Sequence, residues 1–138
     1  MFGNRAGWRF TDVSDILEVS ITGLKGAHYL DKTDKSARNL ESAAAIRITA
    51  ETNRVYPDTA GTVEIRDAKF RRAVRVEKSS SASTVVWNPW PTQRMPDFDL
   101  AEHRQMVCVE SGNVGQNKLS LAPGKTAGLK VVLSSRPF

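Results

Sequence analysis

One glutamate of this sequence stands where a carboxylate can take part in proton transfer. Glu110 directly follows the apolar run Met106–Val109. If the carboxylate is partly desolvated together with that run, its pKa rises toward values suited to accepting a proton near neutrality. Such a group acts as a general base. The alternative is an ordinary solvent-facing glutamate at the end of a strand, and the residues alone favour that alternative.

A proton-transfer reaction also needs an acid, and the sequence offers few candidates for it. The two histidines are His28 and His103, and we expect both to be ordinary surface side chains. The single cysteine, Cys108, lies inside the apolar run and has no second cysteine to pair with, so we expect a small buried hydrophobe there. Nothing near it is suited to lowering a thiol pKa.

The elements that must position these residues are mostly strands. Apolar and polar residues alternate with a period of two in several short runs separated by turn residues, a pattern typical of an all-β sandwich. A hairpin turn is expected at 67–69, a polar loop at 79–83 and a turn at 123–125. Asp97 and Asp99 can cap a short helical turn at 100–104. The expected strands are 16–22, 45–50, 62–66, 70–77, 84–87, 105–110, 118–121 and 128–134.

Composition and charge limit the protein class. At 138 residues the chain is the size of one domain, and no apolar run approaches the ~20 residues of a membrane helix. The first residues do not resemble a secretory signal, so we expect a soluble cytoplasmic protein with no membrane partner. The net charge of +5 and the basic residues between Arg66 and Lys78 permit a nucleic-acid alternative. Because acidic and apolar residues alternate with them, we favour a solvated strand face and no nucleic-acid partner.

Several segments together resemble the hexose-6-phosphate mutarotases (glucose-6-phosphate 1-epimerases) of the galactose mutarotase-like superfamily. The resemblance covers residues 12–134, corresponds to the C-terminal half of a family member, and implies a galactose mutarotase-like supersandwich of which only that half is present. The segments that carry it are Val13-Ser14-Asp15-Ile16, Gly23-Leu24, Tyr29-Leu30-Asp31-Lys32, Thr52-Asn53-Arg54-Val55-Tyr56, Val85-Val86-Trp87-Asn88-Pro89-Trp90, Met106-Val107-Cys108-Val109-Glu110 and Leu119-Ser120-Leu121-Ala122-Pro123-Gly124.

The resemblance implies a reaction and site residues. It implies acid/base ring opening that interconverts the α and β anomers of a hexose 6-phosphate, with Glu110 as the base and no cofactor or metal. Asn53 stands where many relatives have an aspartate that resembles a sugar-hydroxyl ligand. Arg54 is expected either to orient that segment or contact sugar, or to form a structural ion pair. Trp87 and Trp90 can supply an aromatic wall, although core packing of at least one is the favoured alternative.

Two departures from the family pattern limit the expected activity. The family's acid is a histidine shortly before the Val-Ser-Asp-Ile segment, where this chain has Trp8. The arginines that hold the 6-phosphate are expected in the N-terminal half. We therefore expect impaired epimerase activity, with a non-catalytic carbohydrate-binding or regulatory remnant as the alternative. Residues 1–11 are expected to be divergent or disordered, residues 12–138 to form the sandwich, and exposed sheet edges to permit self-association.

Overall fold

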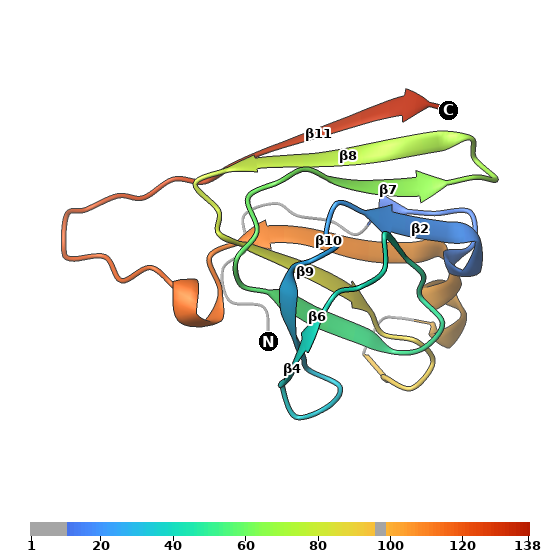
Figure 1. Cartoon of the computed structure of the whole chain (residues 1–138), viewed down its shortest axis with the longest axis horizontal. Helices are drawn as coiled ribbons and strands as arrows, with labels where there is room; N and C mark the ends of the chain where they lie inside the picture. Colours follow the sequence, from blue (N-terminus) through green and yellow to red (C-terminus); the bar gives the residue numbers. More distant parts are fainter. Residues whose placement is uncertain (1–10, 96–98) are drawn as a thin grey trace.

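Two antiparallel sheets stacked face to face make up the described part of the chain. The computed structural model describes residues 11–95 and 99–138 (Figure 1). The six-stranded sheet has the order β1-β10-β9-β6-β3-β4, and the five-stranded sheet has the order β11-β8-β7-β2-β5. The strands are β1 Thr11–Asp12, β2 Val19–Thr22, β3 His28–Asp31, β4 Ala37–Leu40, β5 Ala45–Ile46, β6 Thr52–Tyr56, β7 Val63–Asp67, β8 Arg72–Ser79, β9 Ser83–Asn88, β10 Met106–Gly112 and β11 Lys130–Pro137.

The alternating sequence pattern explains why the sheets pack. In β2 and β7, every second side chain is buried, and these side chains face the six-stranded sheet. They join Tyr56, Val86 and Val107 of that sheet in one apolar core. Burial of this apolar surface between the layers is the main force that holds the two sheets together. The predicted all-β sandwich is therefore confirmed.

The predicted turns also agree with the structure. Residues 68–71 connect β7 and β8 as a hairpin, and residues 80–82 carry the chain from β8 in one sheet to β9 in the other. The 3-10 helix η2 (Leu100–Gln105) is capped by Asp99, whose side chain accepts a hydrogen bond of 2.8 Å from the Ala101 N–H. Asp97 lies outside the described residues, as does the segment 1–10.

Three predicted strands differ from the structure. Residues 16–18 form the 3-10 helix η1 (Ile16–Glu18), because the Asp15 carboxylate accepts the Leu17 N–H at 3.1 Å and caps a turn there. Only Ala45–Ile46 of the run 45–50 pairs with another strand. The run 118–121 is extended but joins no sheet in the described part of the chain, and it follows η3 (Gly115–Asn117) in a projecting loop (Figure 1).

A buried carboxylate, Asp67, fixes the end of β7. It accepts hydrogen bonds from the Ser14 N–H (2.7 Å), the Ser14 hydroxyl (2.6 Å) and the Phe70 N–H (3.0 Å). Burial opposes ionisation, but these hydrogen bonds and the nearby Arg72 outweigh it and hold the pKa of Asp67 below its usual value.

Stability is therefore expected to depend on the ionisation of Asp67. Because its folded-state pKa is depressed, its contribution is present above the unfolded pKa of about 3.9 and is lost as pH falls through the folded value. Urea unfolding measured from pH 7 down to about pH 2 is expected to show this loss. In Asp67→Asn, stability at pH 7 falls by about 1–3 kcal/mol, and the acid-dependent loss becomes smaller. An unchanged pH profile in Asp67→Asn would contradict the assignment.

The helices in the described part of the chain are short 3-10 segments, and none of them could span a bilayer.

Candidate functional site

The strand register brings two predicted site residues to one face of the six-stranded sheet. Glu110 on β10 lies opposite Val85 on β9, and Cys108 lies opposite Trp87, which in turn lies opposite Asn53 on β6. Directly opposed residues of antiparallel strands point to the same face, as do residues two apart on one strand. Glu110, Trp87 and Asn53 therefore share a face, which we call the Glu110 face. From strand spacing and rise, the Cα atoms of Glu110 and Asn53 are roughly 12 Å apart.

The Glu110 face is turned away from the second sheet. The alternate residues of the same strands, including Val86 and Val107, enter the core between the sheets. On the Glu110 face, Trp87 packs with Met106 and Cys108 in a separate apolar cluster, against which Met95 also lies. Glu110 itself is only 7% exposed and Trp87 only 9%. The predicted burial of Glu110 is thus observed, although it lies within β10 rather than at its end.

The two tryptophans around Asn88-Pro89 are both packed against other side chains. Trp87 belongs to the cluster on the Glu110 face, and Trp90 lies against the inter-sheet core. Asn88 is fully buried between them and holds this corner together. Its amide donates to the main-chain oxygens of His103 (2.8 Å) and Met106 (2.9 Å), and its carbonyl accepts from the Trp90 N–H (2.8 Å). Core packing therefore describes both tryptophans, and an aromatic wall against sugar stays a prediction for Trp87.

Arg54 points to the opposite face from Asn53, since the two are adjacent in β6. Its guanidinium donates to the carboxylate of Glu41 at 2.9 Å, and that carboxylate also accepts the Tyr56 hydroxyl at 2.9 Å. Arg54 lies over the ring of Tyr29, 4.8 Å from its centroid. Burial raises the pKa of Tyr56, and the charge of Glu41 adds to this effect, so the phenol stays protonated and donates. The predicted ion pair is present, and contact of Arg54 with sugar stays a prediction.

Sequence reasoning missed Glu41, the central acceptor of this cluster. Glu41 is 5% exposed and directly follows β4. The sequence around it has no apolar pattern that would predict a buried residue. A buried carboxylate needs a cation or several donors, and these come from β6. The available signal was the pair of polar residues Asn53 and Arg54 inside an otherwise strand-like segment.

The two histidines differ in their surroundings. His28 is exposed at the start of β3, in the hairpin that β3 forms with β4, which confirms the expectation for it. The surface prediction for His103 is wrong, because η2 turns this side chain inward. Its ring lies 5.1 Å from that of Trp90, and its Nδ1 atom lies within hydrogen-bonding distance of the Leu100 carbonyl. Trp8, at the position of the expected acid, lies outside the described residues.

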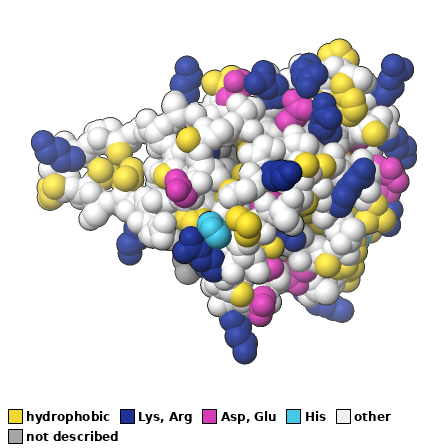
Figure 2. Space-filling model, in the orientation of Figure 1, with side chains coloured by type: hydrophobic (Ala, Val, Ile, Leu, Met, Phe, Trp, Pro, Cys, Tyr) yellow, Lys and Arg dark blue, Asp and Glu magenta, His cyan; other side chains and the backbone are white. Residues whose placement is uncertain are grey.

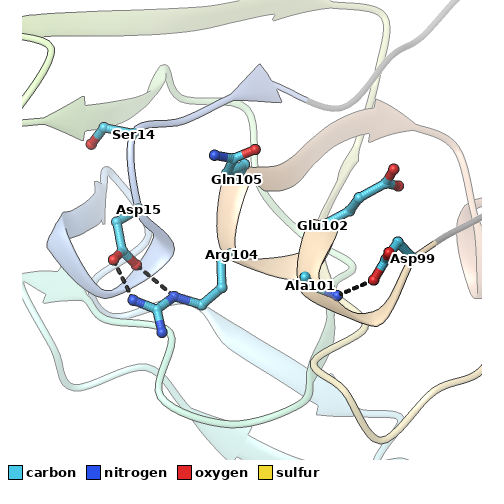
Figure 3. A pocket seen from close by; sticks show the side chains of 7 residues that line it. All are labelled: Ser14, Asp15, Asp99, Ala101, Glu102, Arg104 and Gln105. Carbon is cyan, nitrogen blue, oxygen red and sulfur yellow. Dashed lines mark hydrogen bonds and ion pairs between the residues drawn. The ribbon is translucent and has the colours of Figure 1, made fainter.

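A polar pocket of about 440 Å³ lies beside η1 and η2 and contains none of the predicted site residues (Figure 3). Asp15 and Arg104 face each other across it in a two-point ion pair. Hydrogen bonds from Arg104 and from the Leu17 N–H lower the pKa of Asp15. The acidic and basic groups here satisfy one another, so the pocket is explained as the junction of two short helices.

The basic residues of β7, β8 and β11 are interspersed with acidic partners. Glu64 pairs with Arg66 at 2.8 Å and with Arg136 at 3.0 Å, and Arg75 lies 3.5 Å from Glu77. Figure 2 shows the Lys and Arg side chains spread over the visible surface with acidic side chains among them. This distribution favours a solvated face over a track for a phosphate backbone. The described residues contain no group of three or more His, Cys, Asp or Glu arranged to hold a metal ion.

Comparisons with known proteins converge on one family. A family model described as aldose 1-epimerase matches residues 1–134. A protein of Cenchrus ciliaris named "Putative glucose-6-phosphate 1-epimerase" is 35% identical over 127 residues, which make up 91% of this chain and 38% of that protein. The chain thus spans about two fifths of this relative.

Solved structures share the fold. A structure titled as a putative mutarotase, YeaD, from Salmonella typhimurium matches with a TM-score of 0.69 and 28% identity, over 74% of this chain and 35% of that one. The protein HI1317 matches with a TM-score of 0.78 over 92% of this chain and 44% of that one, and its 19% identity shows likeness of fold alone. The predicted mutarotase-like sandwich is confirmed.

Proposed function

Because the chain belongs to the aldose 1-epimerase family, we propose that it carries the base side of a site that interconverts the anomers of a hexose 6-phosphate. Glu110 removes the proton from the anomeric O1 hydroxyl. An acid must protonate the ring oxygen O5 so that the ring opens, the carbonyl rotates, and closure gives the other anomer. The choice of a 6-phosphate sugar is supported by the name of the Cenchrus ciliaris relative.

The observation that carries this proposal is the shared face of Glu110 and Asn53. A base acts only on a sugar that is held in position, and Asn53 offers one acceptor and two donors to hydroxyl groups. Arg54 keeps a supporting role, since its bond to Glu41 holds β6 from the opposite face. Trp87, on the strand between those that carry Asn53 and Glu110, offers the edge of an indole ring to a sugar.

Binding can be tested separately from catalysis. When glucose 6-phosphate is added to the ¹⁵N-labelled chain, we expect shifts in the side-chain amide signal of Asn53 and the indole signal of Trp87. The matched control is the side-chain amide of Asn39, which is exposed on β4. Asn53→Ala is expected to weaken binding by about tenfold, the effect of losing roughly 1.4 kcal/mol of hydrogen bonding. Shifts of Asn39 with none at Asn53 or Trp87 would contradict the proposed sugar site.

The proposal also predicts impaired catalysis by this chain alone. Glu110 supplies one of the two proton transfers, and the residues that supply the other and hold the phosphate are expected in a part of the family fold that this sequence does not include. A chain that binds sugar but never accelerates anomer exchange, even when that part is supplied, would be a carbohydrate-binding remnant instead.

A further inference from the structure

In the described part of the chain, β11 is the longest outer strand of either sheet. β11 pairs residue for residue with β8, from Lys130 opposite Ser79 to Pro137 opposite Arg72. No other strand among the described residues pairs with its outer edge, which runs free along the upper side of the molecule in Figure 1. The apolar residues Val132 and Leu133 are 43% and 67% exposed. An exposed edge of this kind is a template for another strand.

The direction of the free backbone groups follows from one hydrogen bond. The Phe138 N–H donates to the Arg71 carbonyl at 3.3 Å, which continues the ladder between β11 and β8. Because backbone groups alternate in direction along a strand, the even-numbered residues of β11 bond to β8 and the odd-numbered ones face outward. Val131, Leu133 and Ser135 therefore present free N–H and C=O groups. Pro137, which has no N–H, also falls on the outward side, as expected for an edge strand.

We propose that two copies of this chain pair through antiparallel β11 strands about a two-fold axis at Val132. A two-fold axis perpendicular to the sheet keeps each side chain on its own face, so only residues of equal parity can be opposed. The axis must therefore lie midway between one residue and the same residue of the other copy. With Val132 opposite its own copy, each Val131 lies opposite Leu133 of the other copy, and each such pair exchanges both backbone hydrogen bonds.

Charge selects this register from its neighbours. An axis at Leu133 would place Lys130 opposite Arg136 of the other copy and Val131 opposite Ser135, which opposes two cations and separates apolar residues. An axis at Val131 would place Lys130 opposite Val132 and would pair only residues 130–132 of β11 with β11 of the other copy, whereas the axis at Val132 pairs residues 130–134. The register at Val132 instead places Lys130 opposite Ser134 and joins the apolar residues of both copies.

The assembly is expected to stop at two copies. The opposite edge of the five-stranded sheet is β5, which contains only Ala45 and Ile46. The outer strands of the other sheet, β1 and β4, are also shorter than β11. Each copy has a net charge of +5, so the copies repel, and salt is expected to strengthen the pairing by screening that repulsion. Sedimentation at rising protein concentration should show a dimer that is favoured by higher salt.

Engineered cysteines in the full chain can show which residues of the two β11 strands lie opposite each other. In a non-hydrogen-bonded antiparallel pair the Cα atoms are about 4.5 Å apart, within disulfide range. Val132→Cys is thus expected to give a covalent dimer on mild oxidation. Ser134→Cys is the matched control, because the two copies of residue 134 lie four positions apart, roughly 13 Å, which no disulfide spans. The native Cys108 is buried and is not expected to interfere.

Leu133→Pro tests the free edge itself. Because residue 133 directs its N–H outward, this substitution removes a donor from the proposed interface while leaving the hydrogen bonds to β8. We expect a monomer whose circular dichroism matches that of the unaltered chain. Cross-linking of Val132→Cys but not Ser134→Cys, with loss of the dimer in Leu133→Pro, would support the proposal. A monomer at all concentrations and salt levels, equal cross-linking of both variants, or cross-linking of Leu133→Cys instead would overturn it.

Discussion

Glucose 6-phosphate is expected to exchange between its α and β anomers at nearly the buffer rate in the presence of this chain. Glu110 can accept the O1 proton, but water must supply the proton to O5. A positioned acid typically contributes about 10²–10⁴-fold. Exchange spectroscopy by NMR measures the interconversion directly at equilibrium, and the buffer-catalysed background is subtracted.

Supplying the rest of the fold is expected to restore the rate. The N-terminal part of the Cenchrus ciliaris relative can be fused ahead of Asp12, where β1 pairs with β10: Thr11 lies opposite Val107, and Asp12 lies opposite Met106. The fused segment therefore enters beside the strand that carries Glu110. Exchange is expected to rise by at least about 10²-fold, the contribution of one positioned acid. Trp8→His in the unfused chain is expected to raise the exchange rate little, since it restores a histidine without the segment that would position its side chain.

Glu110→Gln in that fusion should abolish the gain, because an amide cannot accept the O1 proton. The matched control is Glu77→Gln, which alters a half-exposed glutamate on the other sheet and should leave exchange unchanged. Robust exchange by the unfused chain that is lost in His28→Ala or His103→Ala would contradict the assignment of the missing acid. A fully active fusion carrying Glu110→Gln would refute Glu110 as the base.

The sequence pattern was sufficient to predict the sandwich, but it was not sufficient to predict the polar strands within it. Val63–Asp67 follows strict alternation because one face of β7 meets the core. Arg72–Ser79 alternates less regularly, since Ala73 and Val76 are both buried although they lie on opposite faces of β8. β3, β4 and β6 carry polar residues on both faces. β3 and β4 form a local hairpin, but the place of this hairpin in the sheet depends on β6, which pairs with β3 and with the distant β9. The expected strand at 118–121 had the right pattern but no neighbour in the described residues. Strand formation depends on pairing, which a local pattern does not reveal.

The candidate site shows the same limit. The run before Glu110 predicted its burial, and this is observed. The shared face of Glu110 and Asn53 could not be derived from spacing, because it requires β9 to lie between β10 and β6 with a particular register. A shift of one residue in either ladder would have turned Asn53 to the opposite face. Only the family resemblance joined these two segments in advance.

Glu41→Ala is expected to be the most destabilising of the single substitutions considered, with a loss of about 3 kcal/mol in the free energy of unfolding. Removing one partner of a buried ion pair costs about 3–5 kcal/mol, and the lower end applies because the Arg54 side chain is 25% exposed. The loss would leave Arg54 and the Tyr56 hydroxyl without their shared acceptor. Tyr56→Phe, which removes one hydrogen bond, is expected to cost only about 1 kcal/mol. Urea unfolding measures both.

Two further variants separate the ion pair from general surface effects. The double substitution Glu41→Leu with Arg54→Met replaces both charges by apolar groups, and it is expected to recover most of the loss, since such replacements are often neutral. Glu77→Ala removes a partner of the exposed pair with Arg75 and is expected to cost less than about 1 kcal/mol. If Glu41→Ala were as mild as Glu77→Ala, the Glu41–Arg54 pair would not hold β6. Asn53 would then owe its position to the β6–β9 ladder alone, and the supporting role proposed for Arg54 would fail.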